Sequence, residues 1–164
     1  MNGHSRLGER GSATVEFAVV AVLFLTLLLG IMDFGRMLFT WNAAAEATRW
    51  GARVAVVCDK ADAGLVLARM QTFLPQLTGA NVVISWENPE GVADPGCDPS
   101  NCKGVQVSIY NNPANPSDPN NFRIQPISPF MGFLMPPVPA FATYLPRESM
   151  QAASPAGDAN PVCM

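Results

Sequence analysis

The chain has 164 residues, of which 49% are hydrophobic and 14% are charged, and its formal net charge is −3. This length allows one modest domain. An acidic chain with dispersed basic residues argues against nucleic acid as a partner. The single histidine, His4, lies near the N-terminus, and no nucleotide-binding loop or nucleophile motif is present. We therefore predict neither an enzyme nor a cofactor.

A charge-free apolar run extends from Phe17 to Met32, and one carboxylate, Glu16, stands just before it. Counted from Ser12, the run forms a helix of about 31 Å, which matches a bilayer core of about 30 Å. We therefore predict a transmembrane helix over residues 12–32. The basic leader before it and the acidic chain after it predict a cytoplasmic N-terminus and an outer C-terminus.

Three kinds of membrane segment fit this run. A cleaved secretory signal is disfavoured because no small-x-small pattern ends it. An uncleaved signal anchor explains the apolar run but gives Glu16 no role, so its carboxylate would simply lie at headgroup depth. Residues 11–17 (GSATVEF) resemble the class III signal of type IV pilins. That resemblance implies cleavage between Gly11 and Ser12, after which Glu16 pairs with a neighbouring subunit's amine in an apolar filament core.

The resemblance extends further along the chain, through Asp33-Phe-Gly-Arg36 and through the Ala-rich residues 43–53, which end in Arg-Trp-Gly-Ala-Arg. Together these stretches are similar to the TadE family, minor pilins or pseudopilins of the Tad (tight adherence, Flp) pilus. The resemblance implies an inner-membrane protein with a periplasmic C-terminal domain. It also implies partners: a prepilin peptidase, other Tad subunits and minor pilins, and an inner-membrane assembly platform. Glu16 and Phe17 take the subunit-recognition role in this interpretation.

We predict a disordered, cleaved leader over residues 1–11 and one long helix over residues 12–57. The exposed half of this helix shows an apolar stripe at helical spacing, which favours a core-facing surface. Its members are Phe34, Leu38, Trp41, Ala45, Thr48, Ala52 and Ala55.

Arg49 and Arg53 are four residues apart on this helix, and Glu46 lies three residues before Arg49. This spacing predicts a solvated face with one weak ion pair. A subunit contact at the two arginines is the functional alternative.

A small domain is predicted over residues 58–146, followed by a tail over 147–164. Asp59 is a candidate cap for a second helix, with Asp62 in its first turn and an end near Pro75 and Gly79. The apolar face of this helix would comprise Leu65, Met70, Phe73, Leu74 and Leu77.

The period then changes to two, which predicts an antiparallel pair of strands. The buried faces are Val82, Ile84 and Trp86 on one strand and Val105, Val107 and Ile109 on the other. The alternation of Phe141, Thr143 and Leu145 suggests a third strand. Residues 111–121 have loop composition, 122–127 suggest a short extended piece, and 128–139 either cover the sheet or touch the membrane.

Four cysteines, Cys58, Cys97, Cys102 and Cys163, all follow the membrane run, on the side where disulfides form. Three pairings are possible. Local closure of Cys97 with Cys102 would leave Cys58 with Cys163. A metal site is disfavoured because the local spacing is Cys-x4-Cys and no histidine is near, and a redox role lacks a supporting context.

The sequence thus predicts an α+β protein in which a long helix packs on a small antiparallel sheet, as in pilins. The function predicted from the resemblance is that of a TadE-type minor pilin acting in pilus biogenesis or tip assembly. The alternative is an uncleaved single-pass envelope protein whose outer domain binds a partner.

Overall fold

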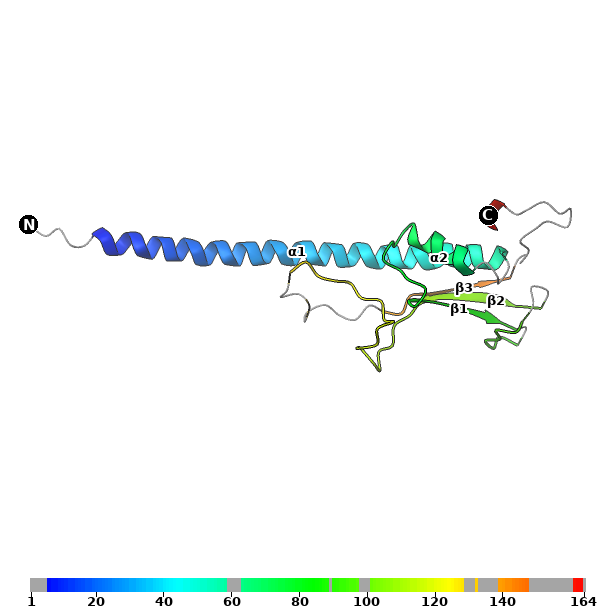
Figure 1. The fold of residues 1–164 in the computed structure, drawn as a ribbon. Coiled ribbons are helices and arrows are strands. Elements are labelled where there is room, and N and C mark those ends of the chain that lie inside the picture. The colour runs from blue at the N-terminus through cyan, green and yellow to red at the C-terminus, as the bar shows by residue number, and fades with distance from the viewer. Residues whose placement is uncertain are drawn as a thin grey trace, which may run out of the picture. The chain divides into compact units, whose positions relative to one another are not determined.

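The computed structural model describes residues 6–58, 63–88, 90–97, 101–128, 132, 139–147 and 161–163, with the backbone alone at 6–10 and 161. It contains two compact units (Figure 1). The helix unit comprises Met1–Leu38 and Gln125–Met135, and the sheet unit comprises Phe39–Ile124 and Pro136–Met164. The fold is α+β, as predicted, with one candidate transmembrane helix among the described residues.

Helix α1 extends from Arg6 to Val57. The prediction that residues 1–11 are disordered is wrong for residues 6–11, because the helix begins before Ser12. Arg6, Leu7, Glu9 and Arg10 all favour helix, and no proline interrupts the approach to Gly11. Residues 1–5 lie outside the described part of the chain.

The predicted apolar stripe of α1 is partly wrong. Phe34 and Leu38 are exposed, whereas Thr48, Ala52 and Ala55 of the stripe are buried. The other buried positions from the second half of the helix to the residue after it are Met37, Thr40, Ala44, Ala47, Gly51, Val54, Val56 and Cys58. The buried face is made largely of small side chains, so large apolar residues are a poor marker for it.

Helix α2 spans Ala63–Gln71 and buries Val66 and Met70. The helix ends four residues before Pro75, and a series of turns leads to the sheet. The side-chain amide of Gln71, the last residue of α2, donates to the Leu77 carbonyl oxygen within these turns at 2.8 Å. The predicted cap and first-turn residues, Asp59 and Asp62, lie outside the described residues.

Three antiparallel strands form one sheet, with β2 (Gly104–Ile109) between β1 (Val82–Glu87) and β3 (Ala142–Pro146). The register places Val82 opposite Ile109, Ile84 opposite Val107 and Trp86 opposite Val105. The two predicted strand faces therefore lie on the same side of the sheet. The third predicted strand is confirmed as β3, in which Thr143 pairs with Val107.

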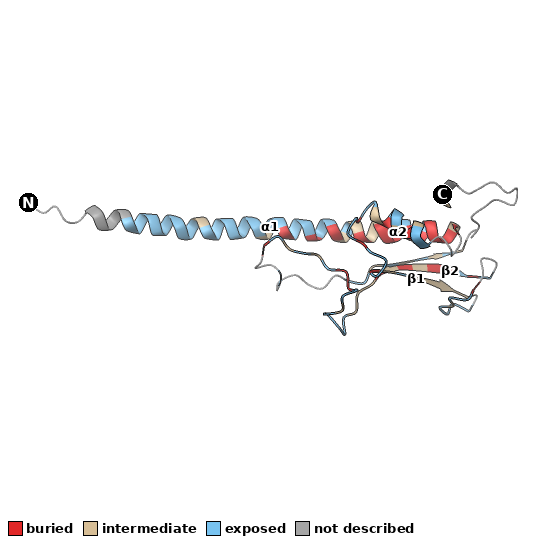
Figure 2. Ribbon diagram, viewed as in Figure 1, coloured by how far each residue is buried: buried red, intermediate tan, exposed pale blue. Residues whose placement is uncertain are grey.

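The core of the sheet unit lies between the sheet and the two helices. Val105, Val107 and Ile109 of the central strand are at most 1% exposed, and Met70 of α2 is fully buried. Figure 2 shows the buried positions concentrated on the second half of α1, on α2 and on β2. A Cβ atom added at Gly51 would lie 2.8 Å from Met70 and 3.3 Å from Val107. Gly51 thus allows α1 to approach both α2 and the sheet.

The segment after β2 contains turns but no strand over residues 122–127, so the predicted extended piece does not join the sheet. Phe122 is nevertheless buried, and its N–H donates to the Tyr110 carbonyl oxygen. The Asn121 side chain closes the preceding loop by accepting from Asn112 N–H at 2.7 Å and donating to Asn115 O at 2.9 Å. Most of the 128–139 stretch, and residues 148–160 of the predicted tail, lie outside the described residues.

Candidate assembly site

The predicted cleavage and recognition residues lie on successive turns near the start of α1. Gly11, Ser12, Glu16 and Phe17 are all exposed, and the Ser12 hydroxyl donates to a Glu16 carboxylate oxygen at 3.4 Å. Phe17 is 74% exposed, and a Cβ atom at Gly11 would meet nothing within 4 Å. Glu16 therefore presents its carboxylate beside a large apolar side chain.

The surface that follows Glu16 is apolar around the whole circumference of the helix. Large side chains from Val15 to Met32 are exposed, including Phe24, Leu25 and Leu28. One window of 18 residues in this helix has a mean hydropathy of 2.6, and none of it is buried. By length and composition this helix is suited to cross a membrane.

Asp33 marks the end of the charge-free run and is 1% exposed. Its two carboxylate oxygens accept separate backbone hydrogen bonds, from Ile127 N at 2.8 Å and from Ser128 N at 2.9 Å. We call this arrangement the Asp33 clamp. The sequence analysis missed it because the partners are 94 and 95 positions away in the chain. A lone carboxylate directly after an apolar run was the one signal that pointed to the position.

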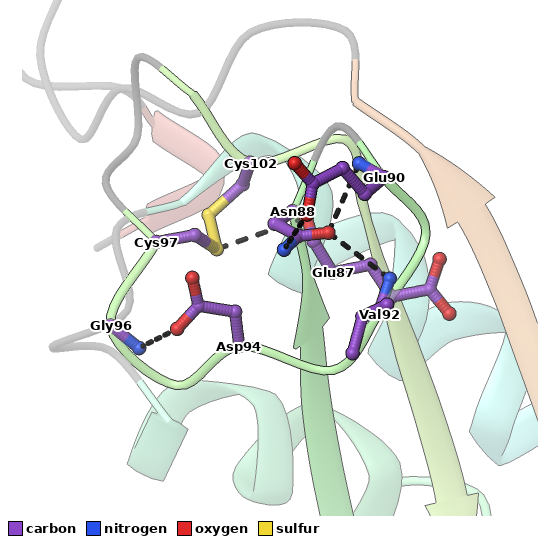
Figure 3. Close-up of a disulfide and its surroundings, with 8 residues drawn as sticks. All are labelled: Glu87, Asn88, Glu90, Val92, Asp94, Gly96, Cys97 and Cys102. Atoms are coloured by element: carbon purple, nitrogen blue, oxygen red, sulfur yellow. Dashed lines mark hydrogen bonds between the residues drawn. A yellow bond between two sulfur atoms is a disulfide. The ribbon is translucent and has the colours of Figure 1, made fainter.

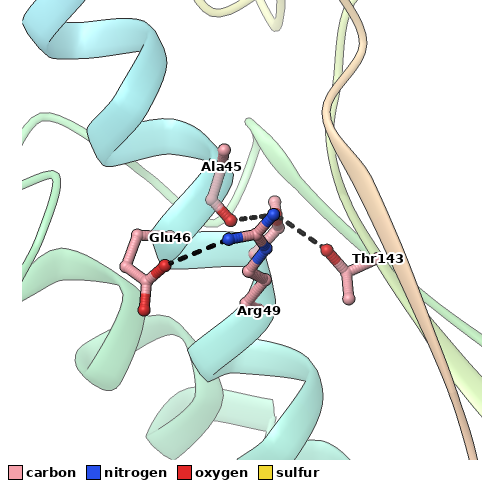
Figure 4. Close-up of polar contacts among 5 residues, drawn as sticks. Ala45, Glu46, Arg49 and Thr143 are labelled. Atoms are coloured by element: carbon pink, nitrogen blue, oxygen red, sulfur yellow. Dashed lines mark hydrogen bonds and ion pairs between the residues drawn. The ribbon is translucent and has the colours of Figure 1, made fainter.

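Arg49 and Arg53 do not share a partner. Arg49 pairs with Glu46 at 3.6 Å, with both side chains well exposed (Figure 4). Arg53 instead lies over the indole ring of Trp50, 5.4 Å from its centroid. Trp50 also stacks on Phe73 with ring centroids 6.0 Å apart. This arrangement matches the predicted solvated face with a weak ion pair, and adds an exposed aromatic pair that the sequence analysis did not identify.

On the opposite side of the same helical segment, the Thr48 hydroxyl lies within hydrogen-bond distance of two groups. The Ala45 carbonyl oxygen accepts from it at 2.9 Å, and the Thr143 hydroxyl of β3 lies 3.1 Å away (Figure 4). This contact fixes the third strand on α1, while the two arginines remain available at the surface.

The structure joins Cys97 to Cys102 and Cys58 to Cys163. These are the two bonds that follow from local closure of the β1–β2 loop. The first bond lies beside β1, where Cys97 Sγ is 3.8 Å from the Glu87 carbonyl oxygen (Figure 3). The second bond connects the end of α1 to the short helix η2 (Pro161–Cys163). All four thiols are therefore consumed, and none is left as a nucleophile or metal ligand.

The β1–β2 loop is ordered by the side chain of Asn88. Its Oδ1 atom accepts from Glu90 N at 3.0 Å and from Val92 N at 3.1 Å (Figure 3). Gly91, between them, has a φ of 79°, a conformation that side chains disfavour. Within the described part of the loop, these bonds hold the turn around Gly91.

Tyr144 of β3 is partly covered and lies beside Glu87 of β1. Burial raises the pKa of this phenol, and the Glu87 carboxylate beside it raises the pKa further. Both effects disfavour the phenolate form of Tyr144. Among the described residues no cluster of histidine, cysteine, aspartate or glutamate side chains is suited to hold a metal ion.

No curated protein and no solved structure matches the chain. Residues 11–53 match the family model described as TadE-like protein. The matched stretch begins at Gly11, includes Glu16, the apolar surface and Asp33, and ends at Arg53. The resemblance to the TadE family noted from the sequence is therefore confirmed over this stretch, because residues 11–53 match the pattern of the TadE-like family.

Proposed function

We propose that this chain is a minor pilin or pseudopilin of TadE type that takes part in the biogenesis or tip assembly of a Tad (Flp) pilus. The observation that carries the proposal is the family match over residues 11–53, which includes an apolar window of 18 residues that the described chain leaves uncovered. Such a surface needs either lipid or other helices around it. A subunit that moves from membrane to filament uses both.

In this proposal a prepilin peptidase cuts between Gly11 and Ser12. The new amine at Ser12 is positive, and Glu16 lies one turn further along α1 with only a long hydrogen bond from the Ser12 hydroxyl. The carboxylate is thus available to pair with the amine of an adjacent subunit. In an apolar filament core this pairing offsets the desolvation of both charges.

The sheet unit supplies the surface that the assembled subunit presents. We assign it no catalytic step, and its role is packing and recognition. The chain would lie in the inner membrane of a bacterium, with its N-terminus in the cytoplasm and the sheet unit in the periplasm until assembly. Its partners would be the peptidase, other Tad subunits and the inner-membrane assembly platform.

A second candidate is an uncleaved single-pass envelope protein whose outer domain binds a partner. One observation favours it: α1 continues without a break from Arg6 through Gly11 and Ser12. A peptide bond inside a helix must unwind locally before a peptidase can cut it. The two candidates differ in the fate of that bond.

Loss of the Glu16 carboxylate tests the assembly role. In cells that lack the native gene, we expect Glu16→Ala to abolish pilus assembly, counted as pili per cell by electron microscopy. Glu46→Ala is the matched control, since it removes a carboxylate from the same helix that pairs only weakly with Arg49. Normal pili with Glu16→Ala, at equal protein level, would contradict the proposed recognition.

A further inference from the structure

The charge-free part of α1 is short for a membrane helix. From Phe17 to Met32 it contains sixteen residues, which span about 24 Å. A bilayer core is about 30 Å thick, and the span of about 31 Å counted from Ser12 fills it only if Glu16 enters the core. With Glu16 at headgroup depth, a helix that left the lipid at Met32 would force the bilayer to thin locally. The residue that limits the run is Asp33.

The Asp33 clamp removes this carboxylate from the surface of the helix unit. Both oxygens are engaged by backbone N–H groups, and the side chain is almost fully covered. Two N–H donors stabilise the ionised carboxylate in place of water. At the same time, Asp33 satisfies two backbone donors of the 127–128 segment, which apolar surroundings would otherwise leave unpaired.

Exposed apolar side chains lie near the clamp in the same unit, together with the exposed residues Arg36 and Gln125. Phe34 is 53% exposed, Leu38 is 41% exposed, and Ile127 of the clamped segment is 52% exposed. Arg36, one turn after Asp33, has a long aliphatic stem that allows its charged end to reach the headgroups. From Phe17 to Leu38 the helix spans about 33 Å, which matches the bilayer core.

We propose that lipid contacts α1 as far as Leu38, and that Ile127 lies in the bilayer interface beside it. The occupant of this surface is the boundary between acyl chains and headgroups of a phospholipid bilayer. The argument is continuity: the exposed side chains of Phe34, Leu38 and Ile127 prolong the apolar surface of the same unit. The inference rests on the membrane insertion contained in the proposed function, and adds the depth and the role of Asp33.

Site-directed spin labelling of the full chain in phosphatidylcholine–phosphatidylglycerol vesicles tests the inference. Single cysteines replace Leu25, Phe34, Ile127 or Asn42, labelled without reductant so that the native disulfides persist. At each position the accessibility to oxygen, which concentrates in lipid, is compared with that to a water-soluble nickel chelate. We expect Phe34 and Ile127 to favour oxygen, as Leu25 does, and Asn42 to favour nickel.

The clamp is tested by adding Asp33→Ala to the Ile127 label. We expect Ile127 to lose its lipid contact and favour nickel, while Leu25 is unchanged. Glu46→Ala is the control and should leave the Ile127 label as it was, because Glu46 pairs with Arg49 and belongs to the sheet unit, not to the unit that contains Asp33 and Ile127. An Ile127 label that keeps its oxygen preference with Asp33→Ala would overturn the role of the clamp.

The remaining outcomes separate this inference from the proposed function. Nickel preference at Phe34 and Ile127, with oxygen preference at Leu25, would place the boundary at Met32 and overturn the inference alone. Exclusion of both reagents at Phe34 and Ile127 would show that protein, and not lipid, covers the surface, which also overturns it. Nickel preference at Leu25 would contradict membrane insertion and the proposed function with it.

Discussion

The apolar part of α1 and the core of the sheet unit are made of the same kinds of side chain, yet they are used in opposite ways. Val22 and Leu25 are more than half exposed, whereas Val105 and Val107 are fully buried. The sheet unit completes its own core with a sheet, two helices and two disulfides. The apolar helix has no such cover in the described chain and depends on its surroundings. Substitutions in the two regions should therefore damage different properties.

The largest contrast is expected from one buried and one exposed valine. Val107→Asp places an unpaired charge in the core and should cost the sheet unit more than about 4 kcal/mol, enough to unfold it. Val22→Asp should leave the sheet unit folded but weaken membrane insertion by about 2.5–3.5 kcal/mol. Urea unfolding followed by tryptophan fluorescence, and vesicle flotation, measure the two effects. Similar unfolding curves for both variants would contradict the separation.

The two disulfides should stabilise the sheet unit unequally. Cys58 and Cys163 are 105 positions apart, whereas Cys97 and Cys102 are 5 apart. Because a cross-link removes more chain entropy when it closes a longer loop, we expect a loss of about 4.7 kcal/mol for the first bond and about 2 kcal/mol for the second. Paired Cys→Ser variants, compared by urea unfolding, check the order. A larger loss for the Cys97–Cys102 pair would show that the loop entropies do not decide it.

Gly51 and Gly30 of α1 allow the same comparison with smaller expected changes in the free energy of unfolding. Gly51→Ala inserts a methyl group against Met70 and Val107 and should cost about 1–3 kcal/mol. Gly30→Ala meets nothing within 4 Å and should favour the helix by up to about 1 kcal/mol without changing the unfolding of the sheet unit. Thermal unfolding of both variants distinguishes them. Equal melting temperatures would mean that the core relaxes around the new methyl group.

The smallest effect is expected at the exposed ion pair. Arg49→Ala should change the free energy of unfolding by no more than about 0.5 kcal/mol, because both partners are well solvated. If Arg49 contacts another subunit, as the functional alternative holds, the same variant should reduce pilus number while stability stays unchanged. Unfolding and pilus counts measured on the same variant therefore separate the two interpretations.

The parts of the fold that the sequence predicted are those with a local pattern. Alternation along 82–87, 105–110 and 141–145 predicted the three strands that the structure places at 82–87, 104–109 and 142–146, since period two leaves few other interpretations. The core-facing side of α1 was misassigned at Phe34 and Leu38. There the apolar pattern distinguishes the two sides of the helix poorly, because half of the buried positions from Met37 to Val56 are alanine or glycine, while the large side chains of Phe34 and Leu38 are exposed.

The candidate assembly site likewise contains residues that the sequence predicted and residues that it did not. Gly11, Ser12, Glu16 and Phe17 are neighbours in sequence, so the pattern alone placed them together on one helix. The Asp33 clamp joins a helix to backbone groups of a segment more than 90 positions away. Backbone donors leave no trace in side-chain identity, so no local pattern could reveal these partners. The stacked pair of Trp50 and Phe73 likewise depends on how α2 and the turns after it fold against α1.

Cleavage before Ser12 is the step that turns the apolar helix into an assembly surface, and the mature N-terminus shows whether it occurs. The full chain would be isolated from membranes with and without a Tad-type prepilin peptidase, and its intact mass measured. The proposed function predicts a peptidase-dependent species that begins at Ser12 and is absent in Gly11→Leu. A chain that retains Met1 in both samples would contradict the pilin route and favour the uncleaved envelope protein.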